Sequence, residues 1–235
     1  DLTTFSEDHV LVVETKLGKL EKYNINVYKF NLEENKQDWY KKISSEVNEE
    51  ADQIITLKDN NIVIIGKKYN DEMTSYVPII YKLDSEGNKI WKKGISVPEN
   101  FYTHSIDANS EGRLFYTCNY SRESTGASET RVITISPNSD VLKYETLQEI
   151  SANGILALSN DNFFVYGSNI LVNESRVITK AKYLIIDPEL NILKTHEMSN
   201  IDFPDNKFPE GLNIMPTSSD INVAIQLSDG RIACK

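Results

Sequence analysis

A repeat with a period of about 50 residues constrains the fold of this chain more than any other feature of its sequence. Each copy contains a β-favouring run, a short polar turn and a second β-favouring run. The turns begin at Asn31, Asp84, Ser136 and Asp187, so successive copies are 53, 52 and 51 residues apart. Because Asp, Asn, Ser and Gly adopt the backbone angles that tight turns require, each copy predicts an antiparallel hairpin.

A second series of hairpins alternates with the first. Polar turns interrupt β-favouring runs within residues 54–66, 105–116, 155–167 and 221–234, and a shorter version spans residues 2–13. Apolar residues at the spacing of an α-helix are almost absent. The chain is therefore built from units of four antiparallel strands in about 50 residues, which is typical of the blades of a β-propeller.

About four and a half blades account for the whole sequence. We place four complete blades at residues 1–49, 50–99, 100–149 and 150–200 and a partial blade at residues 201–235, in a single all-β propeller domain. The partial blade would leave an open strand edge through which the chain could pair with another chain. Because a closed propeller has about 4 to 8 blades, we expect this chain to be a fragment of a larger propeller of about seven or eight.

The segment from Lys82 to Trp91 carries the most detailed version of the repeat. A strand ends at Asp84, a turn containing Gly87 follows, and Trp91 stands on the next strand. This element resembles the repeat of bacterial quinoprotein-like (PQQ-like) propellers, in which the Trp docks against the neighbouring blade. The resemblance implies a blade-docking role for Trp91 and for Trp39 in the first copy. It also implies export, so that the expected location is extracellular or periplasmic.

The charge of the chain bears on the kind of partner it can have. The formal net charge is −10 and the pI is about 4.9. An acidic surface repels phosphate backbones and anionic lipid headgroups, so we expect no nucleic-acid partner. No run approaches the roughly 18 apolar residues of a membrane-spanning helix, so we expect no membrane insertion.

Residues that could carry catalysis or hold a metal are scattered. His9, His104 and His196 lie in different blades without the spacing of zinc ligands, and the acidic turns lack the alternating oxygen ligands of a calcium loop. No residues match the cofactor and calcium ligands of quinone-cofactor enzymes, so we predict no catalytic, metal-binding or cofactor-binding residue. Cys118 and Cys234 are either buried apolar residues or a disulfide pair, and we favour the first alternative.

Binding is predicted on the loops between the second and third strands of the blades. These loops are residues 70–76, 120–129 and 168–175, and the connection at residues 99–104 adds aromatic side chains. Variable loops on a rigid scaffold are where binding sites usually lie, although loops also vary because nothing restrains them. The candidate binding residues are Tyr76, Phe101, Tyr102, His104, Tyr120 and Arg122.

The favoured function is a non-enzymatic propeller that binds another protein or a carbohydrate, as a binding or scaffold module in the cell envelope. The alternative is a propeller enzyme, a carbohydrate hydrolase or lyase, whose axial site is completed by blades that this chain lacks. Glu14, Asp107 and Arg122 could approach such a site, but nothing in the sequence distinguishes them from solvated charges. Clustered carboxylates at the axis would favour the enzyme, and an aromatic face would favour the binding module.

Overall fold

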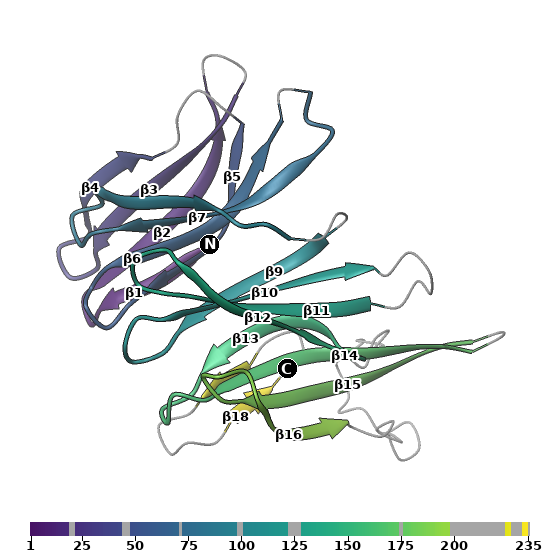
Figure 1. The fold of residues 1–235 in the computed structure, drawn as a ribbon. Helices are drawn as coiled ribbons and strands as arrows, with labels where there is room; N and C mark the ends of the chain where they lie inside the picture. The colour runs from purple at the N-terminus through teal and green to yellow at the C-terminus, as the bar shows by residue number, and fades with distance from the viewer. Residues whose placement is uncertain are drawn as a thin grey trace, which may run out of the picture. The chain divides into compact units, whose positions relative to one another are not determined.

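The regular structure of this protein consists of β-strands (Figure 1). The computed structural model describes residues 1–18, 22–43, 48–70, 72–97, 101–121, 128–173, 176–197, 224–226 and 232–234. Four sheets of four strands follow one another along the chain, and the short pair β17 (Ala224–Gln226) and β18 (Ile232–Cys234) comes last. The predicted all-β class with four-stranded units is confirmed.

The sixteen long strands divide evenly among the four sheets, and each sheet keeps its strands in chain order. The first sheet contains β1 (Leu2–Ser6), β2 (His9–Leu17), β3 (Tyr23–Asn31) and β4 (Lys36–Lys42), and the second contains β5 (Glu49–Thr56), β6 (Ile62–Tyr69), β7 (Tyr76–Leu83) and β8 (Lys89–Gly94). The third contains β9 (Phe101–Ala108), β10 (Leu114–Ser121), β11 (Ser128–Ile135) and β12 (Val141–Leu147), and the fourth contains β13 (Ser151–Ala157), β14 (Phe163–Asn173), β15 (Arg176–Ile186) and β16 (Ile192–Glu197). Neighbouring strands of the first, second and fourth sheets pair antiparallel, as successive hairpins require.

The chain divides into two compact units, each with its own apolar core. Unit 1 comprises Asp1–Pro98, Ser110–Leu114 and Ile135–Leu142, and unit 2 comprises Glu99–Asn109, Phe115–Thr134 and Lys143–Lys235. The core of unit 1 joins the first and second sheets through side chains such as Leu11, Ile25, Ile64 and Tyr81. The core of unit 2 joins the third and fourth sheets, and the rings of Phe115 and Phe163 stack there with centroids 3.6 Å apart.

The buried strands explain the uninterrupted apolar runs of the sequence. Ile62, Val63, Ile64 and Ile65 in β6 are all inaccessible to solvent. A strand that is covered on both faces needs no polar side, so every position can be apolar. The outer strand β8 differs, because its exposed and half-buried residues alternate along much of its length.

The turns of the first hairpin series have a common hydrogen-bonded frame. In the second sheet, Asp84 Oδ1 accepts hydrogen bonds from the backbone N–H groups of Glu86 and Asn88 at 3.0 and 2.7 Å. The Asn88 side chain donates to Asp84 Oδ2 at 3.0 Å, and Asp84 N donates to Asn88 O at 2.9 Å. Asp and Asn therefore fold the turn through their own side chains, which confirms the hairpin predicted from their spacing.

The fourth sheet contains a feature that the sequence interpretation placed wrongly. Residues 168–175 were expected to form a loop, but Ser168–Asn173 continue β14 and pair with β15 up to Asn173 opposite Arg176. β13 pairs with β14 only as far as Ser168, and β16 pairs with β15 only as far as Lys182. Residues 169–173 and 176–180 thus continue past the sheet as a two-stranded ribbon, which we call the β14–β15 arm (Figure 1). The Asn and Ser residues suggested a loop, but the Ile, Leu, Val and Thr residues between them favour a strand.

Cys118 in β10 is buried and is not part of a disulfide. Burial raises the pKa of its thiol to about 12, so the thiolate that reacts and oxidises is strongly disfavoured in the folded protein. Cys118 is thus a buried apolar residue with a free thiol, as the favoured alternative predicted. Within the described residues, no helix has the length and the apolar character needed to cross a membrane.

Candidate functional site

The structure places most of the candidate binding residues in strands rather than in loops. Tyr76 begins β7, Phe101, Tyr102 and His104 belong to β9, and Tyr120 belongs to β10. The strands extend further toward the turns than the polar residues around them suggested, because the aromatic residues themselves favour extended backbone. Phe101 is only 4% exposed, so its ring is part of the interior. Arg122 and most of the loop that contains it lie outside the described residues.

Tyr76 is part of an ordered surface at the tip of the β6–β7 hairpin. It lies opposite Tyr69 in the strand register, and the two ring centroids are 5.4 Å apart. The Tyr69 hydroxyl donates to Glu50 Oε2 at 2.9 Å, and partial burial together with this hydrogen bond raises the pKa of Tyr69. Lys67 lies 5.7 Å from the centre of the Tyr76 ring and 3.1 Å from Asp52 Oδ1. The aromatic pair is therefore held from both sides by polar contacts.

Asn70 closes the turn that joins the two strands. Its side-chain oxygen accepts hydrogen bonds from Thr74 N and Ser75 N at 2.9 and 3.3 Å, and its amide donates to Thr74 Oγ1 at 2.9 Å. A backbone hydrogen bond of 3.0 Å from Asn70 N to Ser75 O completes the closure. Met73 on this turn and Val77 in β7 are 42% and 49% exposed, and Val77 lies on the face of the hairpin opposite to Tyr76. We call Tyr69, Met73, Tyr76 and Val77 the hairpin-tip surface.

Tyr120 belongs to a different environment on the third sheet. Its hydroxyl donates to Glu129 Oε2 at 2.8 Å, and the Arg131 guanidinium lies 5.5 Å from its ring centre. The same guanidinium lies 5.0 Å from the ring of Tyr144 in β12, which is exposed. Cation–π contacts of this kind fix the cross-strand arrangement of side chains. Tyr120 is thus held within the sheet by its own neighbours.

Acidic side chains within the sheets are hydrogen-bonded to tyrosines. Glu14 Oε1 accepts a hydrogen bond of 2.5 Å from the Tyr28 hydroxyl, which raises the pKa of Tyr28 to about 12. Glu49, whose side chain is fully buried, binds both the Tyr81 hydroxyl and the Lys92 ammonium. A buried carboxylate requires such partners, because desolvation without them is very costly. Glu14 directly follows the apolar run Val10–Val13, which is a sequence signal for such a pair, whereas no apolar run adjoins Glu49.

The carboxylate of Asp107 likewise accepts hydrogen bonds from residues of its own unit, unit 2. The donors are Ala157 N at 2.7 Å and Ala108 N at 2.8 Å. Burial raises the pKa of Asp107, and the two hydrogen bonds act in the opposite direction. The carboxylate therefore ties β9 to the end of β13.

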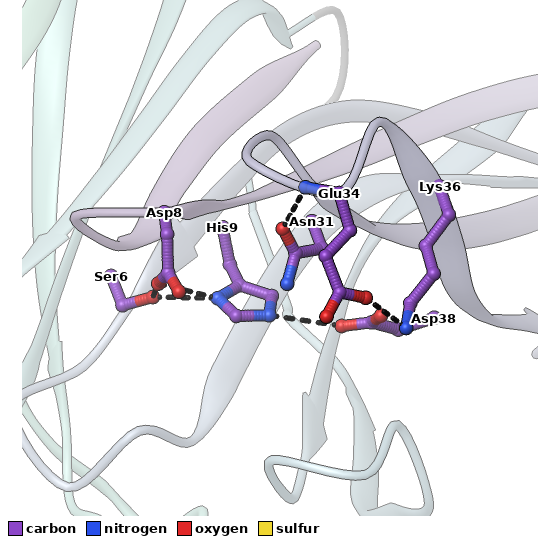
Figure 2. A network of polar contacts seen from close by, with 7 residues as sticks. All are labelled: Ser6, Asp8, His9, Asn31, Glu34, Lys36 and Asp38. Carbon is purple, nitrogen blue, oxygen red and sulfur yellow. Dashed lines mark hydrogen bonds and ion pairs between the residues drawn. The ribbon is translucent and has the colours of Figure 1, made fainter.

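A polar cluster surrounds His9 where the β1–β2 turn approaches β4 (Figure 2). His9 Nδ1 lies 2.7 Å from Asp8 Oδ1, and His9 Nε2 lies 3.0 Å from Asp38 Oδ2. Ser6 Oγ donates to Asp8 Oδ1 at 2.7 Å and lies 3.0 Å from His9 Nδ1. The hydrogen bonds from Ser6 and His9 lower the pKa of Asp8.

The His9 cluster contains the residue types of a Ser–His–Asp triad, but its connections differ. In a triad the histidine accepts the proton of the serine hydroxyl through the nitrogen that faces it. Here Nδ1 faces a carboxylate as well as the hydroxyl, and the hydroxyl donates to that same carboxylate. Both ring nitrogens of His9 lie against carboxylate oxygens, so the nitrogen that faces Ser6 is already in contact with Asp8. The arrangement is therefore that of a structural clamp, in which His9 joins the β1–β2 turn to β4, rather than that of a serine nucleophile and its histidine base.

An open pocket of about 410 Å³ lies beside this clamp. Glu7, Asp8, Leu32 and Glu33 line it, and Leu32 is exposed. Three carboxylates around one apolar side chain favour positively charged groups. Within the described residues, no group of three or more His, Cys, Asp and Glu side chains has the arrangement of a metal site.

The two tryptophans contact the turn of the sheet that follows their own. Trp39 lies against Gly87, where a Cβ atom would be only 3.0 Å from the Trp39 ring. Lys41 on the same strand donates to Asn88 Oδ1 at 3.1 Å. Trp91 donates from Nε1 to Pro137 O at 3.0 Å. Each contact joins an outer strand to the next hairpin turn, and the blade-docking role of the two tryptophans stays a prediction.

Comparisons with known proteins place this architecture among solved β-propellers. No protein-family model matches the sequence, and no curated protein matches it. An acylaminoacyl peptidase from Pyrococcus horikoshii is similar in structure at 15% identity, with a TM-score of 0.53 over 85% of this chain and 32% of the peptidase chain. The chain thus spans about a third of that enzyme.

Two carbohydrate-active proteins are similar to the same degree. The α-L-arabinofuranosidase of Fusarium graminearum, solved with arabinobiose, is 10% identical, with a TM-score of 0.52 over 84% of this chain and 65% of its own. The endo-arabinase from Bacteroides thetaiotaomicron is 13% identical, with a TM-score of 0.51 over 97% and 84%. Identities this low establish a shared fold alone. Together with the four-stranded sheets, they show that this chain has a β-propeller fold.

Proposed function

We propose that this protein is a non-enzymatic binding module that holds a partner polypeptide on the hairpin-tip surface. One observation carries the proposal: the tip of the β6–β7 hairpin, where Asn70 closes the turn, carries the exposed Met73, the Tyr69–Tyr76 pair on one face and the exposed Val77 on the other. Single exposed apolar residues are ordinary on a protein surface. Two of them at a hairpin tip that also carries an aromatic pair supply apolar and aromatic side chains of the kind that anchor protein interfaces.

The hydrogen bonds that close the turn support binding in energetic terms. Ordering a flexible loop on association costs free energy, and a surface that is already ordered avoids that cost. Tyrosine presents a large ring with few rotatable bonds and a polar hydroxyl, so it can bury apolar area while keeping a hydrogen bond. The Tyr69 hydroxyl already has such a bond to Glu50. The surface therefore needs little rearrangement before a partner binds.

Charge indicates the chemistry of the partner. The chain carries a formal net charge of −10, and at the hairpin tip the carboxylates of Glu50, Asp52 and Glu72 outnumber the ammonium groups of Lys67 and Lys68, of which Lys67 pairs with Asp52. Complementary potentials accelerate association and exclude partners of the same sign. The partner that fits is a basic polypeptide segment with at least one apolar or aromatic side chain for the Met73 and Val77 surface.

Selection from a phage-displayed library of random peptides tests the proposal with a defined probe. We expect enriched peptides to be basic and to contain an aromatic or aliphatic residue. Their affinity should fall at least about tenfold for Val77→Ser, as expected for a central interface residue. Val141→Ser in β12 is the matched control, because Val141 is also an exposed valine, at 45%. Equal affinity for the two variants, or no enrichment at all, would contradict the proposal.

The enzyme alternative makes a separate prediction. Two of the structurally similar proteins are named as an arabinofuranosidase and an endo-arabinase. Incubation of this protein with arabinan should release no reducing sugar above a buffer control. Release that depends on the protein would overturn the non-enzymatic assignment and favour the hydrolase. Location in the cell envelope, which the repeat resemblance implies, stays a prediction that fractionation of the source cells would test.

A further inference from the structure

In the part of the chain that the structure describes, no further strand pairs with the outer edges of the β14–β15 arm, whose first pair, Asn169 and Lys180, is bonded to Glu197 of β16 through its side chains. β13 ends its pairing with β14 at Ser168, and β16 ends its pairing with β15 at Lys182. Among the described residues, the arm strands therefore pair only with each other, from Asn169 opposite Lys180 to Asn173 opposite Arg176. An isolated pair of strands is marginally stable in water, and open edges readily accept a further strand.

The composition of the arm makes its first strand the better edge for pairing. Residues 169–173 read Asn-Ile-Leu-Val-Asn, without charge, Gly or Pro. Uncharged segments rich in Ile, Val and Leu are those that most readily add to a sheet. Natural edge strands are usually protected by charged residues or by Pro, and residues 169–173 have neither.

The order of these residues is complementary to itself. In an antiparallel alignment centred on Leu171, Asn169 of one copy stands opposite Asn173 of the other, and Ile170 stands opposite Val172. Leu171 stands opposite its own counterpart. We propose that β14 of the arm pairs with β14 of a second copy of this chain in this register. The product is a four-stranded sheet with the two β14 strands inside and a two-fold axis at Leu171.

The second strand of the arm does not offer the same match. An antiparallel alignment of residues 176–180 centred on Ile178 would place Arg176 of each copy opposite Lys180 of the other. Two pairs of like charges would result. Like charges at directly opposed positions destabilise a sheet. Pairing through β14 brings no charged residues opposite each other, so the charges of the arm select one edge.

Sedimentation velocity of the whole chain tests the assembly. We expect a concentration-dependent species of about twice 26.8 kDa. Leu171→Lys places two ammonium groups opposite each other at the axis and should weaken dimerisation by at least about tenfold. Ile178→Lys is the matched control, because Ile178 is the register partner of Leu171 but lies on the outer strand of the proposed sheet. It should weaken dimerisation much less.

Disulfide trapping tests the register even if a lysine variant disturbs the arm. Directly opposed residues of antiparallel strands have Cα atoms about 4.5–5.5 Å apart, which is within the range of a disulfide. In a Cys234→Ser background, Leu171→Cys should form a covalent dimer under mild oxidation, and Ile178→Cys should not. Trapping at Ile178 alone, at both positions or at neither would overturn the proposal. A monomer at all concentrations, for the unmodified chain, would overturn it as well.

Discussion

The turn at residues 84–88 and the turn at residues 187–191 have the same frame but differ at one residue. In both, an Asp side chain accepts hydrogen bonds from two backbone N–H groups and from an Asn side chain. In both, the fourth residue has a left-handed backbone, with φ of 76° at Gly87 and 66° at Leu190. One turn uses the residue best suited to that conformation, and the other uses a bulky residue that rarely adopts it.

The surroundings of the two residues explain the difference. A Cβ atom at Gly87 would lie 2.9 Å from Lys41 Cγ and 3.0 Å from Trp39 Cη2, so the first sheet already fills that space. Leu190 is 5% exposed and packs in the core of unit 2, in a cluster with Leu147 and Ile150 of the preceding segment. The frame of the turn is set by its own Asp and Asn. The identity of the fourth residue depends on the side chains that the preceding part of the chain packs against it.

Truncation of Leu190 should have the largest effect. Leu190→Ala removes buried apolar volume while the left-handed backbone remains, so we expect a loss of about 3 kcal/mol in the free energy of unfolding. Leu193→Ala is the control, because Leu193 is 56% exposed, and it should cost less than about 0.5 kcal/mol. Urea denaturation followed by circular dichroism measures both. Equal losses would mean that burial does not hold Leu190 in its conformation.

Addition of one carbon at Gly87 should have the next largest effect. Gly87→Ala combines a left-handed alanine, at about 1–2 kcal/mol, with contacts against Trp39 and Lys41. Gly112→Ala separates the two costs, because Gly112 has the same φ of 76° but its nearest neighbour would be 4.0 Å away. We expect a loss of about 2 kcal/mol at Gly87 and about 1 kcal/mol at Gly112. If the two losses are the same, Trp39 does not determine the residue at this turn.

The tryptophans allow a finer comparison of the docking contacts. Trp91 Nε1 donates to Pro137 O, whereas Trp39 Nε1 is buried without a hydrogen-bond partner among the described residues. Trp91→Phe should therefore cost about 1 kcal/mol from the lost hydrogen bond. Trp39→Phe should cost less, since it removes an unsatisfied donor along with part of the ring. Thermal unfolding of the two variants measures the difference, and a larger loss at Trp39 would contradict this account.

The turns and sheets could be predicted from the sequence because their causes are local. The spacing of Asp84 and Asn88 encodes a frame that the two side chains build by themselves, and the same spacing recurs at Asp187 and Asn191. The clamp at His9 could not be predicted, because its contact with Asp38 joins residues on strands separated by β3. Such a contact depends on the register across three strands, which residue types alone do not specify.

The β14–β15 arm shows a different reason for failure. Its polar residues, Ser168, Asn169 and Asn173, are typical of loops, and the interpretation gave them more weight than the apolar residues between them. The segment is extended because β14 and β15 are both long and pair along their whole length. This pairing becomes evident only from the register of the two strands. Tyr76 begins a strand for the same reason, and although a loop is predicted at residues 70–76, the side-chain hydrogen bonds by which Asn70 closes it are not.

Acidification should have the smallest effect, and it tests whether the two turn frames are equivalent. The side chain of Asn88 and backbone N–H groups lower the pKa of Asp84 below its ordinary 3.8, and the Asn191 side chain does the same for Asp187. A carboxyl with a lowered pKa in the folded state adds stability above its unfolded pKa, and this stability is lost as the pH falls through the folded value. Asp84→Asn and Asp187→Asn should therefore each be less stable than the unmodified protein near neutral pH, with a gap that closes as the pH falls below about 4.

Urea denaturation at a series of pH values measures this gap for each variant. Because the same acceptors and donors form both frames, the two gaps should close over the same pH range, even though Gly87 and Leu190 differ. A gap at only one turn would mean that the neighbouring chain segment also determines the Asp frame. If the two Asp variants show equal stability gaps while the substitutions at Gly87 and Leu190 have unequal effects, two causes are separated. The Asp and Asn side chains then determine the hydrogen-bonded frame of each turn, and the preceding segment of the chain determines which residue occupies the fourth position.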